Sequence, residues 1–134
     1  MILVIDNFIK DQKLLNDIAS DSRFFNDPGV YYWWNGWWNS EARTVKQRLI
    51  DYIWADNCPI TAKFSLMGFE YWTGIQTANT ETGFSNNLGN HYDKDEELFA
   101  QTGEIVRPVI GTVYYPEQDQ FEGGMLEVYT EGVD

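Results

Sequence analysis

The hydrophobic pattern of this chain changes its period near residue 60, and that change is the strongest constraint on the fold. Before it, apolar residues recur at the three- and four-residue spacing of helices. After it, runs rich in aromatic and β-branched residues alternate with polar turns, as in strands. Helices that precede strands, rather than alternate with them, are typical of an α+β protein with helices packed on an antiparallel sheet. The length of 134 residues fits one domain, 1–134, with a helical part over 1–60 and the strands over 61–134.

Two helices are expected in the first half of the chain. Asp11 is a suitable N-cap for the first helix, and Asn39 or Ser40 for the second. The second helix should end before Asn57-Cys58-Pro59, because the residue before a proline disfavours helical geometry. The apolar faces of the two helices carry Leu14, Leu15, Ile18, Ala42, Val45, Leu49, Tyr52 and Ile53.

Strands are expected at 2–5, 64–75, 88–93, 106–115 and 125–129. The run at 106–115, which stops at Pro116, has the strongest strand pattern. Polar residues at 77–87 and 118–124 predict loops or turns. The acidic run Asp95-Glu96-Glu97 predicts a solvated loop.

Four tryptophans flank Asn35-Gly36, a dipeptide typical of a tight turn between two short arms. Stacked indoles bind sugars, bases and prolyl rings, so Trp37 and Trp38 are candidates for a substrate platform. Packing between the helices and the sheet is the favoured interpretation, because aromatic side chains bury large areas in protein cores. Both roles are compatible if one tryptophan of each pair, Trp33-Trp34 and Trp37-Trp38, points inward.

Charge and cysteine content argue against several classes of function. The chain has 21 acidic and 9 basic residues, a net charge of -12, which repels phosphate backbones and anionic membranes. We therefore expect no nucleic-acid or membrane partner. Cys58 is the only cysteine, cannot form an internal disulfide, and is most simply an inert thiol. The sequence has no basic leader and no apolar run of membrane-spanning length, so a cytoplasmic location is expected.

His91-Tyr92-Asp93 is the main candidate for chemistry, because it pairs the only histidine of the chain with a carboxylate two residues later. On an extended strand, residues i and i+2 lie on the same face, so the two side chains would converge. An imidazole and a carboxylate are two of the three protein ligands in the 2-His-1-carboxylate site that holds non-haem Fe(II). The spacing alone is weak, since acids fill 21 of 134 positions and a lone histidine is more often a hydrogen-bonded structural residue.

Four further segments accompany this pair in a definite order. They are Val4-Ile5-Asp6-Asn7-Phe8-Ile9, Phe69-Glu70-Tyr71-Trp72, Thr112-Val113-Tyr114-Tyr115-Pro116 and Phe121-Glu122-Gly123-Gly124-Met125-Leu126-Glu127-Val128. With His91-Tyr92-Asp93, their order resembles the Fe(II)- and 2-oxoglutarate-dependent dioxygenases of the prolyl-4-hydroxylase-like branch. The resemblance covers essentially the whole chain.

The resemblance implies a double-stranded β-helix core (jelly-roll, cupin-like) with N-terminal helices packed on one sheet. It implies Fe(II), 2-oxoglutarate as cosubstrate, ascorbate as a further cofactor, and hydroxylation of a C–H bond in a peptide or small molecule. His91 and Asp93 match the metal ligands. Tyr71, Tyr115 and Leu126 match positions that contact 2-oxoglutarate, although ordinary core packing is an equal alternative for both tyrosines.

The family continues beyond Gly-Gly-x-Leu with more strands, a second iron-binding histidine, and an Arg or Lys that pairs with 2-oxoglutarate. No basic residue follows Arg107 here. We therefore expect a C-terminally truncated portion of an oxygenase that holds only the first core strands, is inactive alone, and can self-associate through unpaired sheet edges. The alternative is a non-catalytic jelly-roll module whose tryptophans bind a carbohydrate or peptide. A cupin-type metalloprotein fits less well, because it would have more histidines in the first motif.

Overall fold

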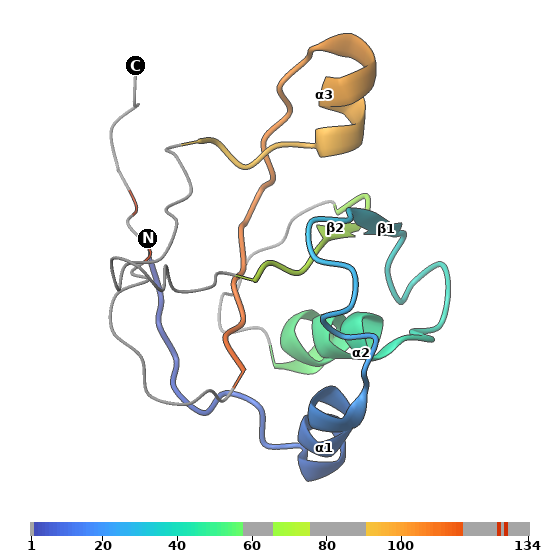
Figure 1. Cartoon of the computed structure of the whole chain (residues 1–134), viewed down its shortest axis with the longest axis vertical. Coiled ribbons are helices and arrows are strands. Elements are labelled where there is room, and N and C mark those ends of the chain that lie inside the picture. Colours follow the sequence, from blue (N-terminus) through green and yellow to red (C-terminus); the bar gives the residue numbers. More distant parts are fainter. Residues whose placement is uncertain (1, 58–65, 76–90, 117–125, 127, 129–134) are drawn as a thin grey trace, which may run out of the picture. The chain divides into compact units, whose positions relative to one another are not determined.

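The computed structural model describes residues 2–57, 66–75, 91–116, 126 and 128. The chain divides into two compact units, Met1–Gly74 and Ile75–Asp134. The elements in order are α1 (Gln12–Ser20), β1 (Tyr32–Trp34), α2 (Val45–Asp51), the π-helical segment η1 (Tyr52–Asp56), β2 (Phe69–Tyr71) and α3 (Glu96–Thr102) (Figure 1). This mixture of helices with an antiparallel strand pair is compatible with the predicted α+β class; the single-domain expectation stays a prediction.

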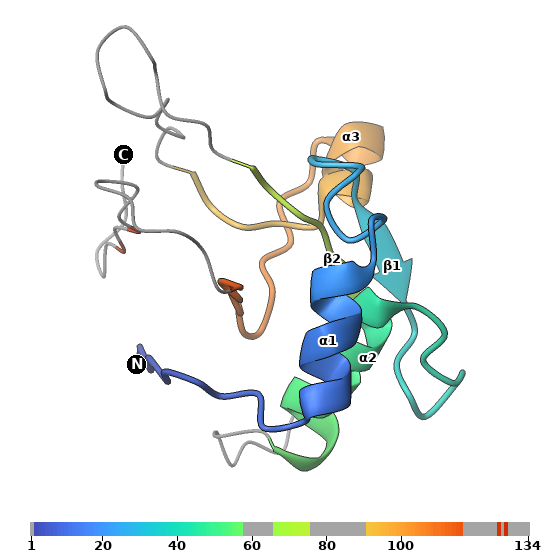
Figure 2. The same cartoon turned by 60° about the horizontal axis from the view of Figure 1, so that its bottom comes forward.

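Helix α1 forms as the sequence predicts. The carboxylate of Asp11 accepts a hydrogen bond from the Leu14 N–H at 3.0 Å, which satisfies one of the unpaired amides of the first turn. Leu14 and Ile18 are buried, and α1 packs alongside α2 (Figure 2). On the polar side of α1, the Arg48 guanidinium of α2 donates a hydrogen bond to the Asp17 carboxylate at 2.8 Å. This bond lowers the pKa of Asp17 most, and the bond from Lys13 lowers it further.

Helix α2 begins later than predicted. Its N-cap is Thr44, whose hydroxyl accepts a hydrogen bond from the Gln47 N–H at 3.1 Å. The prediction that Asn39 or Ser40 caps this helix is therefore wrong. The backbone N–H groups of Asn39 and Ser40 both donate to the Gly36 carbonyl at 3.1 Å, which uses them in a turn instead. The helix continues as η1 and ends at Asp56, which confirms the predicted end before residue 57.

The sheet pairs two segments that lie far apart in the sequence. Strands β1 and β2 run antiparallel with Tyr32 opposite Tyr71 and Trp34 opposite Phe69 (Figure 1). The strand predicted at 64–75 is confirmed over Phe69–Tyr71 only, and residues 64 and 65 lie outside the described part. The two arms predicted around Asn35-Gly36 do not pair with each other, because the first arm takes β2 as its partner.

A cluster of aromatic rings, which we call the Phe69 cluster, forms the core beside this sheet. Ring centroids lie 5.7 to 6.5 Å from that of Phe69, within the range favoured by aromatic pairs, for Trp34, Trp37, Trp38 and Trp54. Trp34 is 3% exposed, and its indole N–H donates to the Ser40 hydroxyl at 3.0 Å. The packing role is therefore plain for Trp34.

Two predicted strands are wrong. Residues 2–5 and 106–115 have no regular secondary structure, and neither has the described part of 88–93. A β-branched run becomes a strand only when another segment supplies hydrogen bonds, and β1–β2 is the sole sheet among the residues that the structure describes. The predictions for 77–87, 118–124 and Cys58, and most of that for 125–129, fall outside the described residues.

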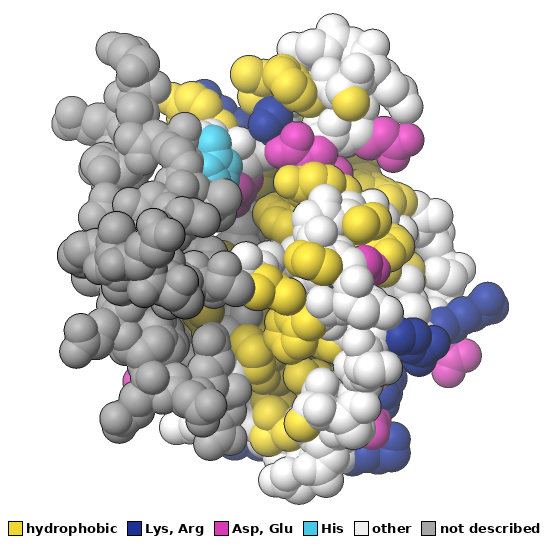
Figure 3. All heavy atoms as spheres, viewed as in Figure 1, with side chains coloured by type: hydrophobic (Ala, Val, Ile, Leu, Met, Phe, Trp, Pro, Cys, Tyr) yellow, Lys and Arg dark blue, Asp and Glu magenta, His cyan; other side chains and the backbone are white. Residues whose placement is uncertain are grey.

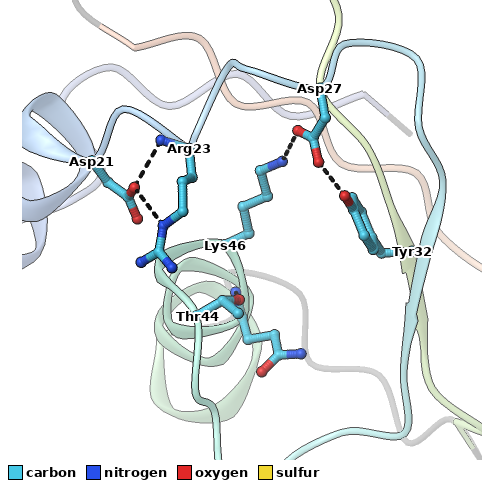
Figure 4. Close-up of polar contacts among 7 residues, drawn as sticks. Asp21, Arg23, Asp27, Tyr32, Thr44 and Lys46 are labelled. Atoms are coloured by element: carbon cyan, nitrogen blue, oxygen red, sulfur yellow. Dashed lines mark hydrogen bonds and ion pairs between the residues drawn. The ribbon is translucent and has the colours of Figure 1, made fainter.

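An ionic and hydrogen-bonded network fixes the loop before β1 (Figure 4). Asp27 accepts a hydrogen bond from the Tyr32 hydroxyl and another from the Lys46 ammonium at 2.9 Å. The ammonium also lies 5.4 Å from the centroid of the Tyr32 ring. The Tyr32 hydroxyl and then Lys46 lower the pKa of Asp27, and the carboxylate in turn raises the pKa of Tyr32. Asp27 therefore connects the loop, β1 and α2.

Replacing Trp34 by Ala is expected to destabilise the chain by about 3–5 kcal/mol, because it empties a buried site of the core. Trp33→Ala is the matched control, since Trp33 is the next residue of the same strand and is 48% exposed. It is expected to cost about 1 kcal/mol or less. Urea unfolding followed by circular dichroism measures both, and equal losses would contradict the inward orientation of Trp34.

Asp27→Asn is expected to lower stability at neutral pH, and the difference from the parent chain should shrink in acid. The folded-state pKa of Asp27 is depressed, so its contribution is present above the unfolded value of about 3.9 and is lost as pH falls below it. Urea midpoints at pH 7 and pH 3 test this. Asp6→Asn, at an exposed acid of the same unit, is the control for the loss of one carboxylate charge.

Candidate functional site

His91 and Asp93 lie close together at the surface of the second unit. His91 Nε2 is 3.5 Å from Asp93 Oδ1, and the side chains are 55% and 47% exposed (Figure 3, histidine in cyan). The strand that was expected to align them is absent, since residues 91–93 have no regular structure. The imidazole and carboxylate are nevertheless near enough to share one small ligand.

Residues 106–111 lie alongside the segment that carries this pair. The Asp95 N–H donates to the Val106 carbonyl at 2.8 Å, and the Arg107 guanidinium lies 4.3 Å from the centroid of the Tyr92 ring. A Cβ atom on Gly111 would lie 3.5 Å from the Asp93 carboxylate. These contacts hold the segment from Tyr92 to Asp95 against residues 106–111.

The acidic run after the pair is the start of α3, so the predicted solvated loop is wrong over these residues. The Asp95 carboxylate accepts the Leu98 N–H at 2.9 Å as an N-cap, and Gly103 ends the helix in the left-handed conformation. Glu96 and Glu97 then stand in the first turn, where negative charge is favourable. The sequence does contain this signal, an Asp cap followed by acids and a terminal glycine.

The chemistry of the pair fits an iron site in part. Neutral imidazole and carboxylate are two of the three ligand types of the facial Fe(II) site. Across the described ranges, no group of three or more His, Cys, Asp or Glu side chains is placed to hold a metal ion. The sequence has no second histidine, so His91 and Asp93 would supply two ligands of such a site and the third would be another group.

The three residues that were predicted to contact 2-oxoglutarate lie in surroundings that differ from one another. Tyr71 belongs to the first unit, where its ring stacks on Tyr32 at 5.6 Å and its hydroxyl accepts a hydrogen bond from Gln47 at 3.3 Å. Tyr115 and Leu126 belong to the second unit, and both are largely exposed. The contacts of Tyr71 are thus those of a packed sheet residue, which was the alternative considered for it.

Trp37 and Trp38 combine packing with exposure. Their rings form an edge-to-face pair at 5.0 Å, and both contact Phe69. The Trp38 ring also lies against Gly36, where a Cβ atom would be 2.4 Å away. Each indole keeps part of its surface exposed, so neither is simply inward or outward.

Comparison of the chain with family models, with curated proteins and with solved structures finds no match. The described helices include none that is both long enough and apolar enough to cross a membrane.

Asp95→Ala is expected to remove the N-cap of α3 and to lower the local stability of the helix by about 1 kcal/mol. This loss corresponds to roughly fivefold faster exchange of the helix amides. Asp95→Asn is the matched control, because an asparagine oxygen also caps. Hydrogen exchange of the α3 amides compares the two. Equal exchange in both variants would argue against a capping role for the Asp95 carboxylate.

Proposed function

We propose that this chain supplies two iron ligands, His91 and Asp93, to an Fe(II)- and 2-oxoglutarate-dependent dioxygenase of the prolyl-4-hydroxylase-like branch. The reaction would place one oxygen atom of dioxygen in a C–H bond of a peptide or small molecule to give the alcohol, while the other oxygen atom enters succinate as 2-oxoglutarate loses carbon dioxide. The observation that carries the proposal is the 3.5 Å separation of His91 Nε2 and Asp93 Oδ1 at the surface of the second unit. The order of the motifs around the pair supports the family assignment.

The roles of the chain's own residues follow from their chemistry. His91 would bind through Nε2 as a neutral imidazole, and Asp93 through a carboxylate oxygen whose negative charge favours a divalent cation. Iron held there would supply the activation of dioxygen. Tyr115 would donate a hydrogen bond to the distal carboxylate of 2-oxoglutarate, and Leu126 would contact its carbon chain. Tyr71 is the weaker candidate, since its ring is packed on Tyr32 and its hydroxyl contacts Gln47 within the first unit.

The proposed double-stranded β-helix core is supported by one feature of the first unit. Strands β1 and β2 pair antiparallel, and the side of the sheet that carries Trp34 and Phe69 packs against Trp54 of η1. A sheet covered on one side by helices is the arrangement expected for the N-terminal part of such a core.

The 134-residue chain is expected to bind Mn²⁺, an air-stable substitute for Fe(II), only weakly, because it offers two ligands at an exposed position. His91→Ala and Asp93→Ala should each weaken binding at least about tenfold, since even loss of an outer-shell partner of a metal ligand costs that much. Electron paramagnetic resonance of Mn²⁺ titrations measures the free ion. Glu104→Gln, at an exposed acid of the same unit, is the control and should bind like the parent.

Mn²⁺ binding that is unchanged in both His91→Ala and Asp93→Ala would contradict the proposed metal site. In a separate assay with iron and 2-oxoglutarate, the chain alone is expected to release no succinate above background, because the site lacks a second histidine. Succinate release above background that disappears in Asp93→Ala would instead mean that two protein ligands suffice.

A further inference from the structure

The Asn35-Gly36 dipeptide after β1 brings a reactive pair of groups together in the sequence. In an Asn-Gly dipeptide, the backbone nitrogen of the glycine can attack the side-chain carbonyl carbon of the asparagine, because the glycine has no side chain to hinder the approach. The new C–N bond closes a five-membered succinimide ring. The C–N bond of the side-chain amide breaks, and its nitrogen leaves as ammonia with the proton of the glycine N–H. Water then opens the ring to aspartate or isoaspartate. The chain contains this dipeptide only once.

The folded turn restrains both reacting groups through hydrogen bonds. Asn35 Oδ1 accepts a hydrogen bond from the Trp33 indole N–H at 2.7 Å, and the Asn35 carbonyl accepts one from the Asn39 side-chain amide at 3.0 Å. The Gly36 carbonyl accepts two more, from the backbone N–H groups of Asn39 and Ser40, each at 3.1 Å. The Asn35 side chain and both peptide groups of Gly36 are therefore held in place.

The Trp38 ring adds a steric restraint, because it lies directly against Gly36. A Cβ atom at Gly36 would be 2.4 Å from this ring. Gly36 also has a φ of 90°, a conformation that residues with side chains rarely adopt. Gly36 is buried, whereas Asn35 is exposed. Rotation of the backbone at Gly36 is therefore opposed by the indole as well as by the hydrogen bonds.

We propose that Asn35-Gly36 is a latent modification site, at which the intact turn suppresses succinimide formation and opening of the turn permits it. The succinimide is a planar ring that includes the Gly36 nitrogen and the Asn35 side chain, so both groups must be free to rotate toward each other. The open turn is a minor state, and one hydrogen bond changes its population about two- to tenfold. Water can then reach the ring, because Asn35 is exposed. The proposal rests on the first unit alone and does not depend on the metal site.

The two products differ in their effect on the core. The aspartate product keeps the backbone and exchanges the side-chain amide for a carboxylate, which can still accept the Trp33 N–H. The isoaspartate product runs the main chain through the former side chain and adds one carbon to the backbone. That carbon lies between Trp34 and Trp37, whose rings both contact Phe69. The isoaspartate product is therefore expected to loosen the Phe69 cluster.

The first test compares the full chain in its folded state with the full chain in concentrated urea, both kept in mildly alkaline buffer. Trypsin releases Asn35 in the peptide 24–43, and fragmentation of that peptide by mass spectrometry locates the modified residue. Modification of Asn35 is expected to be at least about tenfold slower in the folded chain, since several hydrogen bonds of about two- to tenfold each oppose it. Equal rates in the two states, or no modification in urea, would overturn the proposal.

Variants of the hydrogen-bond donors test the restraints one at a time. Trp33→Phe removes the indole N–H and keeps an aromatic ring, so it should speed modification of the folded chain about two- to tenfold. Trp72→Phe makes the same change at an exposed indole outside the turn and should leave the rate unchanged. Asn39→Ala, at an exposed position, removes the donor to the Asn35 carbonyl and should also speed the reaction about two- to tenfold.

Two results from these variants would contradict the protective role of the turn. One is a folded-state rate in both Trp33→Phe and Asn39→Ala that equals the rate of the parent chain. The other is a slower reaction in Trp33→Phe, which would mean that the indole N–H activates the side-chain carbonyl. Circular dichroism confirms that each variant folds, and Asn39→Ala keeps the test valid if Trp33→Phe does not.

The effect on the core is tested with Asn35→Asp as the matched control, because this variant has the charge of the modified chain and an unaltered backbone. Chains that contain isoaspartate are separated from the parent by reversed-phase chromatography and refolded. Their urea midpoint is expected to lie below that of Asn35→Asp, since only the isoaspartate lengthens the backbone of the turn. Equal midpoints would contradict the expected loosening of the Phe69 cluster.

Discussion

The pairing of β1 with β2 is the interaction on which the first unit depends. It places Trp34 opposite Phe69 on the side packed with Trp54, and it leaves Trp33 and Trp72 on the accessible side. Because strand side chains alternate with a period of two, a register shift by one residue would exchange these faces and expose the core. The close fit between the Trp33 ring and Gly68 also opposes such a shift, since a side chain at that position would collide with the indole.

The few basic residues of this acidic chain also connect segments that lie apart in the sequence. Within the described ranges, Lys46 and Arg48 bond carboxylates that come from other segments, and Arg107 stacks on Tyr92. Exposed ion pairs add little stability individually, but these contacts fix which segments lie together. The remaining acids are in large excess, so the surface keeps a field that favours cations. The proposed divalent metal at His91 and Asp93 is consistent with that field.

Prediction from the sequence succeeded where the interaction is local. The Asp11 cap and the buried Leu14 and Ile18 of α1 depend on residues within two turns, and the end of the second helix was foreseen from the proline that follows it. Prediction failed at 2–5 and 106–115, whose β-branched residues fit a strand but form no sheet with the other described segments. The cap of α2 was displaced because Asn39 and Ser40 bond the Gly36 carbonyl. Helix α3 was missed although its cap is local, because its acids were interpreted only as a solvated run.

For the candidate site, the two-residue spacing of His91 and Asp93 was enough to suggest that their side chains would approach each other, but not that they would do so outside a strand. Residue types alone determined the net negative charge and the single imidazole. Together with local hydrogen bonds, they also determined the first helix and the mixed helix-and-strand character. The tertiary structure decided the partner of β1, the side of the sheet on which each tryptophan lies, and the contacts that occupy Tyr71. The physical reason is range: a helix cap bonds a backbone amide three residues away, whereas a strand partner is selected by packing between distant segments, which no short stretch of sequence encodes.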